Sequence, residues 1–467
     1  MRGTRPNIVS IVSDDQGIWA LGCYGNGEIR TPNLDRLASR GIRFDNFFCA
    51  SPVCSPARAS LMTGRIPSQH GIHDWIREGN SRADAIDYLA GQRLYTDRLA
   101  ACGYACGFSG KWHLGDSATP RDGFTHWYVH ERGGGPYYNA PMYRDGERVL
   151  EPGYITDVIT DDALDWIDRA ARSDGPFYAA VHYTAPHSPW IDNHPKAIVD
   201  SYDDCPFASC PDDPPHPWFL GSTVPGGVRE QRRENLKGYF AAVTAMDANI
   251  GRILDKLDAL NITKDTLVFF ISDNGYNCGH HGVWGKGNGT FPLNMYDSSV
   301  KVPTIIAHPG AIPAGTACAA LLSQYDFMPT LLDYLGIEHP DADTLPGRSF
   351  ASLLRGEAVN EREEVVVYDE YGPVRMIRSR EWKYVHRYPY GPHELYDLVS
   401  DPDERNNVFE ERSTAALRAE MKARLEAWFA RYVAPDRDGV REAVYGKGQL
   451  RLAGPAGRGE KAFADDV

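Results

Sequence analysis

The sequence predicts an α/β protein in which helices sandwich a large mixed, mainly parallel sheet, joined to a smaller C-terminal antiparallel sheet with a helix. As far as about residue 360, apolar runs alternate with helical patterns. Strands that alternate with helices are typical of an α/β fold, and nearly continuous apolar runs are typical of parallel strands buried on both faces. Beyond that point short strand patterns follow one another with tight turns, which indicates an antiparallel sheet. We therefore expect a main α/β domain over residues 1–360 and a C-terminal α+β subdomain with a surface tail over residues 361–467.

Four apolar runs are the expected strands of the large sheet, and they cover residues 7–13, 177–182, 266–272 and 302–307. The helical patterns lie between them, and the clearest covers residues 243–260. Its apolar side chains recur at helical spacing along one face. These side chains are Val243, Met246, Ile250, Ile253, Leu254 and Leu257.

The expected strands of the small sheet cover residues 364–370, 374–379 and 382–387. A helix over residues 415–432 is expected to pack on them. The residues after about Ala434 are polar and rich in glycine. We expect them to wrap the surface or to fray.

Acidic or histidine side chains follow each of the four apolar runs. In chain order they are Asp14 and Asp15, then His187 in a loop, then Asp273 and Asn274, and finally His308. Ligands of open α/β sheets bind beyond the carboxyl ends of the strands. The sequence therefore predicts a functional site at that edge of the sheet.

The formal net charge of −14 argues against a nucleic-acid partner or an anionic membrane surface, because phosphate groups would be repelled overall. No apolar run of about 20 residues could cross a bilayer, and no apolar leader is visible. We expect a cytoplasmic protein as the sequence is written, or a periplasmic or secreted one if a leader was removed. The oligomeric state stays open.

The nine cysteines are an odd count in a long chain and do not indicate a disulfide framework. Cys205 and Cys210 are close enough in sequence to pair across a loop, and this alternative stays open. Cys102 and Cys106 are expected to be spaced along a helix, because no second pair of metal-ligand residues lies near them.

The segment Cys54-Ser55-Pro56-Ala57-Arg58 is the most informative part of the chain. Proline suits the first turn of a helix, where its missing N–H would be unpaired anyway, and Gly64 is a natural stop for that helix. A cysteine at a helix start lies where backbone N–H groups and the helix dipole favour negative charge. The fork of donors on Arg58 matches a tetrahedral oxyanion. The pattern predicts a nucleophile beside an anion-binding group.

This pattern resembles the Cys-X-Pro-X-Arg signature of the sulfatase family, in the alkaline phosphatase-like superfamily. Further motifs follow in the order expected of that family as far as about Asn407, and no single one is as specific as the first. They are Gly110-Lys111-Trp112-His113, Ala185-Pro186-His187-Ser188-Pro189, Asp273-Asn274-Gly275, Trp284-Gly285-Lys286-Gly287 and Leu395-Tyr396-Asp397-Leu398. The resemblance implies that Cys54 is oxidised to formylglycine (3-oxoalanine) by a formylglycine-generating enzyme.

Oxygen ligands from two strand ends suit a hard cation such as Ca²⁺ or Mg²⁺. The resemblance assigns the cation to Asp14, Asp15, Asp273 and Asn274 together with the modified Cys54. We expect Ca²⁺ because the set is rich in carboxylates, and Mg²⁺ stays open.

The resemblance also implies roles for the remaining motif residues. Lys111 contacts the sulfate, and Lys286 is the second lysine of the site. His113 acts on the formylglycine hydrate, and His187 lies beside the leaving oxygen. Lys111 and His113 are two residues apart, so they would point to one side of an extended segment.

Proximity in sequence suggests further residues for the substrate pocket. Asp74, Trp75 and Arg77 follow the helix that begins at Cys54, and Tyr137-Tyr138 offers a surface for ring stacking. His182 and His281 also fall near the expected site. For these two histidines a supporting role in the core is the alternative to contact with substrate.

Together these features predict a sulfuric ester hydrolase that acts on a sulfate monoester. The aromatic and histidine-rich loops favour a sulfated carbohydrate as substrate over a small aryl sulfate. The alternatives are an aryl sulfatase, a phosphonate monoester or phosphodiester hydrolase of the same superfamily, and a catalytically silent protein that binds an anion or a sugar.

Overall fold

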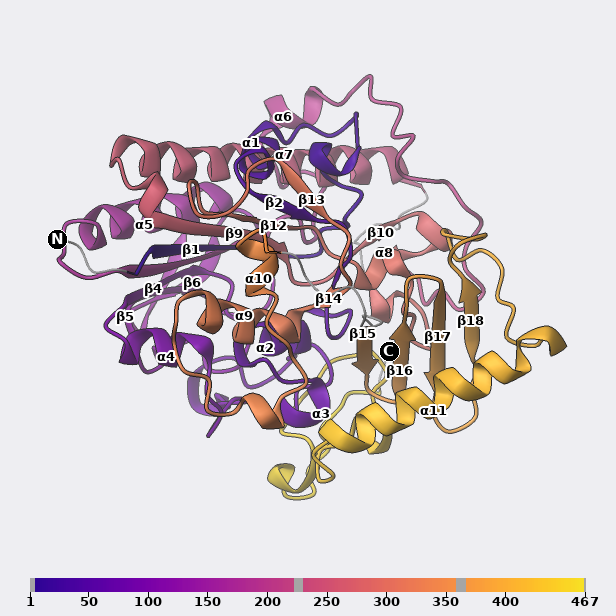
Figure 1. Cartoon of the computed structure of the whole chain (residues 1–467). Coiled ribbons are helices and arrows are strands. Elements are labelled where there is room, and N and C mark those ends of the chain that lie inside the picture. The colour runs from indigo at the N-terminus through magenta and orange to yellow at the C-terminus, as the bar shows by residue number, and fades with distance from the viewer. Residues whose placement is uncertain (1–4, 222–229, 358–366, 466–467) are drawn as a thin grey trace.

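The computed structural model describes residues 5–221, 230–357 and 367–465, and a sheet of ten strands runs through its larger part (Figure 1). The strands lie in the order β13-β2-β12-β9-β1-β8-β4-β5-β6-β7. The five central strands are parallel to one another. They are β9 (Thr266–Ser272), β1 (Asn7–Ser13), β8 (Phe177–His182), β4 (Ala105–Gly110) and β5 (Phe124–His130). The predicted fold class, a mainly parallel sheet between helices, is confirmed.

The outer strands mix both directions. On one side lie β12 (Thr304–Ala307), β2 (Ile42–Phe44) and β13 (Thr316–Cys318), and on the other β6 (Ala140–Arg144) and β7 (Glu147–Glu151). The fourth predicted strand exists as β12, but it runs antiparallel to β9.

The direction of β12 places His308, which follows it, at the amino-terminal edge of the central strands. There its Nε2 atom lies 3.1 Å from the carbonyl oxygen of Lys264, just before β9 begins. The prediction that His308 belongs to the functional edge is therefore wrong. An apolar run gives the position of a strand in the core but not its direction.

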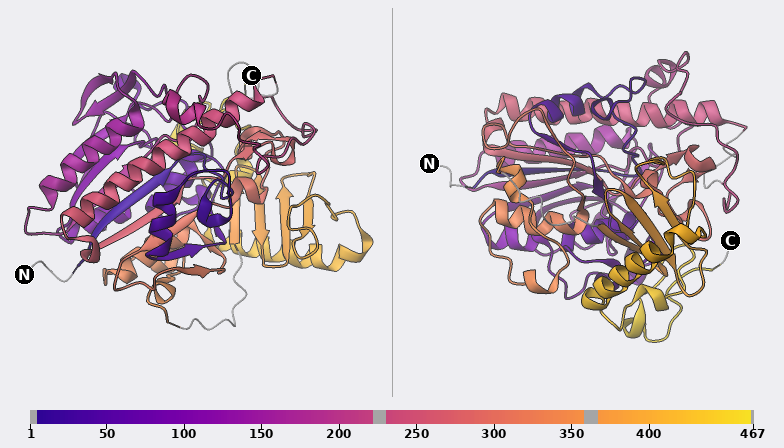
Figure 2. Two further views of the ribbon diagram at one scale, coloured as in Figure 1. Left: turned by 90° about the horizontal axis from the view of Figure 1, so that it is seen from above. Right: turned by 45° about the vertical axis from the view of Figure 1, so that its right-hand side comes forward.

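Helices cover both faces of the large sheet (Figures 1 and 2). One face carries α1 (Pro32–Ser39), α5 (Ile155–Ala170) and α7 (Arg232–Ala259), and the other carries α2 (Cys54–Thr63), α4 (Tyr95–Ala101) and α9 (Phe327–Tyr334). Successive side chains of a strand point to opposite faces. Accordingly Val9 and Ile11 of β1 belong to the apolar cluster with α5 and α7, whereas Ile8 and Val12 belong to the cluster with α2.

Helix α7 begins eleven residues before the predicted helix over residues 243–260. Its first half carries Leu236, Tyr239 and Phe240, which are fully buried against an aromatic cluster that includes Trp190. Charged residues such as Arg232 and Arg233 obscured this part of the pattern. Tertiary packing therefore extends the helix beyond its amphipathic half.

The cysteines are all free. Cys102 follows the end of α4 and Cys106 lies in β4, so the prediction that both are spaced along one helix is wrong. Cys205 and Cys210 are not paired in the structure, which decides against the alternative of a bond between them.

The small sheet is antiparallel throughout, as predicted. Its strands are β15 (Val367–Tyr371), β16 (Val374–Arg378), β17 (Trp382–Arg387) and β18 (Glu394–Asp397), and α11 (Ala415–Tyr432) packs on them (Figure 2). Residues 364–366 of the first predicted strand lie outside the described residues. The predicted boundary between residues 360 and 361 lies outside them as well, so the domain division stays a prediction.

Buried charges join the small sheet to the main domain. The carboxylate of Asp297 accepts hydrogen bonds from Arg378 and Lys383, each at 2.9 Å, and Lys383 also lies 2.5 Å from Glu404. Lys383 is fully buried. A buried charge of this kind is costly unless it is paired. The small sheet is therefore held in one position against the main domain.

The remaining helices and strands are short. They are α3 (Pro67–His70), α6 (Lys196–Asp200), α8 (Asp297–Val300), α10 (Ala351–Leu354), β3 (Phe47–Phe48), β10 (Asn277–Cys278), β11 (Trp284–Gly285) and β14 (Leu322–Ser323). Among the described residues, no helix has the length and apolar composition that crossing a membrane requires.

The C-terminal tail, which we define as residues 434–465, does not simply cover the surface. Val444, Gln449 and Phe463 are buried, with exposed fractions of 5% or less. The prediction that this segment wraps the surface or frays is wrong for these residues. The glycine-rich and polar composition gave no sign of these contacts. Gln449, for example, is held by hydrogen bonds to backbone groups that are distant in sequence.

Candidate active site

The ends of the two neighbouring parallel strands β1 and β9 bring four polar side chains together. The backbone N–H of Asp273 donates to the carbonyl of Ser13 at 3.1 Å, which joins the two strand ends. Carboxylate oxygens of Asp14, Asp15 and Asp273 lie within 4.8 Å of one another, and all three side chains are buried. The amide of Asn274 donates to Asp15 at 2.8 Å. The strand ends therefore form a buried cluster of oxygen atoms.

Each carboxylate of this cluster pairs with a lysine or an arginine. Lys111 donates to Asp14 Oδ2, and Lys286 donates to Asp15 Oδ1. The guanidinium Nε of Arg58 donates to Asp273 Oδ2 at 2.8 Å. Three segments that are distant in sequence thus converge on the two strand ends.

These charges set the protonation of the cluster. Burial opposes ionisation, but Lys111 holds the pKa of Asp14 below its ordinary value, and Lys286 does the same for Asp15. The pKa of Asp273 is raised, by burial and by repulsion from Asp14. A further positive charge at the cluster would favour ionisation of all three carboxyl groups.

The cluster fits a hard divalent cation. Asp14 Oδ1 and Asn274 Oδ1 are buried and have no hydrogen-bond partner among the described residues. A buried oxygen without a partner is costly unless an ion or water satisfies it. Carboxylate and amide oxygens are the ligands that Ca²⁺ and Mg²⁺ prefer. Asp14, Asp15, Asp273 and Asn274 are therefore suited to hold such an ion.

Helix α2 begins at Cys54, as the proline and glycine of the motif predict. Pro56 lies in the first turn, and Gly64 follows the last turn with a φ of 66°. The Cys54 side chain is buried, and its charge would interact with Lys111, Lys286 and Asp14. Burial raises the pKa of the thiol despite the two lysines. A raised pKa favours the thiol over the thiolate, which is the form that attacks efficiently.

Arg58 lies one turn further along α2 and points toward the same cluster. Besides its contact with Asp273, its Nη1 donates to the carbonyl oxygen of Lys111 at 2.9 Å. Its Nη2 atom is buried and has no partner among the residues the structure describes. The guanidinium group therefore keeps a free donor for an anion.

His113 lies close to this group but not in an extended segment. Its φ of 54° turns the backbone out of the extended range, so the prediction that Lys111 and His113 share one side of an extended segment is wrong. The Nε2 atom lies 2.9 Å from the carbonyl oxygen of Ile76. Nδ1 is buried and without a partner within the described part of the chain. Burial, together with repulsion from Lys111, lowers the pKa of His113 well below its ordinary value, so its ring is neutral.

His187 approaches the cluster from the loop after β8. Its Nε2 atom lies 3.6 Å from Asp15 Oδ2, and its Nδ1 atom lies 2.7 Å from the carbonyl oxygen of Ser188. The hydroxyl of Tyr137 donates to the carbonyl oxygen of His187 at 2.7 Å. Tyr137 is itself buried, so it supports this loop and does not offer the stacking surface we expected.

A glycine-rich loop packs against the site histidines, a feature that the sequence reasoning missed. A Cβ atom at Gly133 would lie 2.0 Å from the His113 ring, and one at Gly135 would lie 2.6 Å from His130. A Cβ atom at Gly134 would lie 3.3 Å from His187. Three consecutive glycines were the available signal, since glycine permits a close approach.

We expect Gly133→Ala to lower kcat by about 10- to 100-fold, because the added methyl group must displace the His113 ring. Gly27→Ala is the matched control, since a Cβ atom there would meet no heavy atom within 4 Å. Steady-state kinetics of both variants, with thermal unfolding to show that each is folded, test this. Equal activity of the two variants would contradict the proposed contact between the loop and His113.

The structure places Asp74, Trp75 and Arg77 beside the C-terminal tail. Both carboxylate oxygens of Asp74 are engaged: Oδ1 accepts from Tyr371 at 2.6 Å and Oδ2 from the backbone of Gly448 at 2.9 Å. Burial raises the pKa of Asp74 to about 6. Asp74 therefore anchors the tail and is not available to substrate, which corrects the prediction for this residue. Trp75 and Arg77 are only partly buried.

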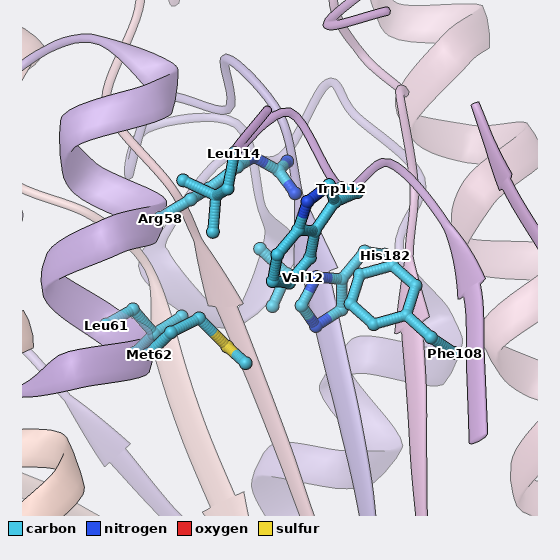
Figure 3. Close-up of a pocket in the computed structure, with 8 residues that line it drawn as sticks. All are labelled: Val12, Arg58, Leu61, Met62, Phe108, Trp112, Leu114 and His182. Carbon is cyan, nitrogen blue, oxygen red and sulfur yellow. The ribbon is translucent and has the colours of Figure 1, made fainter. Parts of the chain in front are cut away.

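The other two predicted histidines, His182 and His281, contact aromatic side chains. Figure 3 shows His182 beside Phe108 in an apolar pocket beneath Arg58, and its Nε2 atom lies 3.3 Å from Ser10 Oγ. The ring of His281 stacks on Tyr296 at 3.8 Å, facing the small sheet. His182 therefore takes the alternative, a supporting role in the core. His281 is only partly buried, and its role in substrate binding stays a prediction.

This fold and this site are typical of hydrolases that act on anionic esters, because a buried carboxylate cluster and several basic side chains meet at the carboxyl edge of the sheet. The sulfatase family model matches residues 6–337, and the model described as the C-terminal region of N-sulphoglucosamine sulphohydrolase matches residues 279–431. The chain belongs to the sulfatase family, and the predicted resemblance is confirmed. It is accordingly a sulfatase, an enzyme that hydrolyses sulfuric esters.

Several known proteins are similar to this chain over most of its length. An N-acetylglucosamine-6-O-sulfatase of Bacteroides thetaiotaomicron is 29% identical, over 96% of this chain and 90% of its own length. An ulvan-active sulfatase of Formosa agariphila is 31% identical, over 90% of this chain and 80% of its own. A solved structure in complex with its substrate D-glucosamine-2-N,6-O-disulfate has a TM-score of 0.79 and 27% identity, over 93% of this chain and 99% of its own.

Proposed function

We propose that this enzyme hydrolyses a sulfate monoester on a carbohydrate, with a formylglycine made from Cys54 and a divalent cation at the aspartate cluster. The observation that carries the proposal is the position of Cys54. It begins α2 within the electrostatic reach of Lys111, Lys286 and the acidic cluster, yet burial raises the pKa of its thiol. A thiol that attacked sulfur would also leave a thiosulfate-like adduct that has no internal route to release sulfate. Conversion to an aldehyde, and hence a hydrate, removes that difficulty.

The substrate class is inferred from the relatives and from the site. The relatives carry the names N-acetylglucosamine-6-O-sulfatase and ulvan-active sulfatase, and a neighbouring structure holds a sulfated glucosamine. The basic side chains of the site suit one sulfate group. We infer that the leaving group is a sugar hydroxyl.

In the proposed reaction, the cation, the modified Cys54 and the basic side chains have different roles. When bound, the cation supplies a Lewis acid that polarises a sulfate oxygen. A formylglycine hydrate supplies an attacking hydroxyl and a second hydroxyl whose deprotonation allows sulfate to leave. Lys111, Lys286 and the free Nη2 donor of Arg58 hold the sulfate oxygens and offset their charge in the transition state.

Two histidines are placed to move protons. His187 is the partly exposed one of the pair, and its Nε2 atom faces the cluster at Asp15. In the proposed mechanism this atom protonates the departing sugar oxygen. His113 is neutral and its Nδ1 atom is without a partner in the described part of the chain, so it is able to accept the proton in the release step.

A comparison of three substrates tests this function. We expect the highest kcat/KM on N-acetylglucosamine 6-O-sulfate, with lower values on an aryl sulfate and on the matched aryl phosphonate. A preference for the phosphonate would replace the proposal with a phosphonate monoester hydrolase. Absence of turnover on all three by enzyme that carries the aldehyde would favour a silent binding protein.

We expect Arg58→Lys to lower kcat/KM by roughly 10²- to 10³-fold, the usual effect of losing one preorganised donor. Arg58 holds Asp273 and the Lys111 carbonyl at the same time and keeps Nη2 free. A lysine ammonium cannot donate to Asp273, to the Lys111 carbonyl and to the sulfate with the geometry of a guanidinium group. Arg40→Lys, at an exposed pair with Asp258, is the control and should retain full activity. Near-normal kcat/KM for Arg58→Lys would remove Arg58 from the sulfate site.

A further inference from the structure

Part of the C-terminal tail is fixed beside the site by buried hydrogen bonds. The side chain of Gln449, which is fully buried, accepts from the backbone N–H of His73 at 2.9 Å and donates to the carbonyl of Gly71 at 3.0 Å. Its backbone N–H donates to the carbonyl of Trp75 at 2.7 Å. Asp74 holds the preceding residue, Gly448, as described above. Residues 445–448 therefore have a defined place and do not move freely.

This part of the tail connects two segments that carry residues of the proposed catalytic group. On one side, Gln449 forms a β-bridge with Ile76, whose carbonyl oxygen holds His113. On the other side, the carbonyl of Gly446 accepts from Asn288 at 3.2 Å, only two residues after Lys286. The tail thus lies between the segment that supports His113 and the segment that supplies Lys286.

An exposed aromatic pair lies where the tail meets the Lys286 segment, and we call this place the rim. Tyr445 and Phe291 are 38% and 43% exposed, and their ring centroids are 5.7 Å apart. The backbone N–H of Phe291 donates to the carbonyl of Trp218 at 2.9 Å, which fixes this part of the rim. Large aromatic side chains are normally covered in a folded protein. A pair that is held in place and left exposed is suited to stack on a sugar ring.

Lys447 brings a positive charge two residues after Tyr445. It is partly buried, and in the described part of the chain it has no carboxylate within ion-pair distance. The residues on either side of it are Gly446 and Gly448, with φ of 75° and 109°. The backbone on either side of the lysine therefore has a conformation that favours glycine. The lysine ammonium is free to bind an anion.

We propose that Tyr445, Phe291 and Lys447 form a second saccharide subsite, which binds the sugar next to the sulfated one. This inference rests on the proposed function, because the sulfated sugar occupies the site at Cys54. The aromatic pair takes the apolar face of the neighbouring ring, and Lys447 takes its negative group. The ligand is therefore an acidic oligosaccharide, such as one with a uronic acid beside the sulfated sugar. The C-terminal tail selects for chain length and charge.

The test compares one sulfated sugar with and without its neighbour. The probes are N-acetylglucosamine 6-O-sulfate and a disaccharide that joins this residue to a uronic acid. We expect wild-type kcat/KM to be higher for the disaccharide, and Tyr445→Ala to lower the disaccharide-to-monosaccharide ratio by about 5- to 10-fold. Tyr445→Phe keeps the ring and should restore the ratio.

The charge is tested in the same assay. Lys447→Ala should lower the ratio by about 5-fold, and less at high ionic strength, since salt screens an exposed charge. Lys461→Ala is the control, because this residue of the same tail forms an exposed pair with Asp465. An unchanged ratio in both Tyr445→Ala and Lys447→Ala, or an equal loss on both probes, would overturn the subsite.

Binding separates failure of the subsite from failure of the proposed function. In a Cys54→Ala background, titration calorimetry with both probes measures affinity without turnover. Tighter binding of the disaccharide that depends on Tyr445 supports the subsite even if the wild-type enzyme hydrolyses neither probe, which would refute the function alone. Equal affinity for the two probes would refute the subsite whatever the activity.

Discussion

Replacement of Cys54 by alanine is expected to lower turnover of sulfate esters by at least about 10⁴-fold, as loss of a covalent nucleophile does in other enzymes. The loss should appear in kcat, because Lys111, Lys286 and Arg58, which we propose hold the sulfate, remain. Alanine is smaller than cysteine and favours the helical conformation, so α2 should remain folded. Steady-state kinetics on the sulfated monosaccharide measure the loss, and circular dichroism shows that the fold is kept.

Cys106→Ala is the matched control for this change. Cys106 is also a buried free cysteine, but it lies in the middle of the large sheet in β4. We expect it to retain activity and to lower the free energy of unfolding by about 1 kcal/mol, a usual value for a small core deletion. Wild-type turnover by Cys54→Ala would defeat the assignment of the nucleophile.

Peptide mass spectrometry over Cys54 adds a measurement that is independent of activity. With an aldehyde-trapping reagent, active wild-type enzyme should show the mass of a trapped formylglycine. The fraction of converted Cys54 should rise when a formylglycine-generating enzyme is produced in the same host, and specific activity should rise in proportion. Full activity of a preparation that contains only the thiol would contradict the need for conversion.

Removal of the divalent cation is expected to lower kcat/KM by at least about 10²-fold, because a Lewis acid contributes several kcal/mol to stabilising the transition state. A second reason to expect this loss lies in the pairs Lys111–Asp14 and Lys286–Asp15. Without the cation, the two carboxylates compete with the sulfate for the lysine amines. Treatment with a chelator, gel filtration and assay with added metals measure the effect.

Metal content and thermal unfolding test the same site without turnover. We expect about one bound ion for each chain and a melting temperature that rises with free Ca²⁺, since a ligand of the native state stabilises it by mass action. Recovery with Ca²⁺ at lower concentration than with Mg²⁺ would agree with the carboxylate-rich set. Asp15→Ala should lose the ion, whereas Asp97→Ala, in α4, should keep it. Full activity after complete removal of metal would refute the cation site.

Local patterns in the sequence were sufficient for much of the fold. The continuous apolar runs located β1, β8 and β9 with their observed ends, and the pattern of α11 gave the observed helix. They were not sufficient for the direction of β12 or for the start of α7. Strand direction depends on how the chain returns to the sheet, and the first half of α7 is stabilised by an aromatic cluster from other segments.

The sequence likewise located some residues of the candidate site and misplaced others. Residues within short motifs, such as Cys54 and Arg58, were located from the helix signals around them. Proximity along the chain misplaced His182, whose side chain belongs to the core beneath Arg58, and Asp74, which anchors the tail. Three consecutive glycines signalled the loop beside His113, but neither its partners nor those of Tyr445 could be found from sequence, because they lie far away in the chain.

The sequence by itself determined the strand ends that carry Asp14 and Asp273, the helix that begins at Cys54, and the family resemblance. The strand ends and the helix start depend on hydrophobic periodicity and helix-end preferences, which act over a few residues, whereas the resemblance depends on short motifs in order. Only the tertiary structure decided which of the polar side chains meet, and that the C-terminal tail is fixed between the segments of Ile76 and Lys286. Hydrogen bonds such as those of Gln449 join residues hundreds of positions apart, and no local pattern records them.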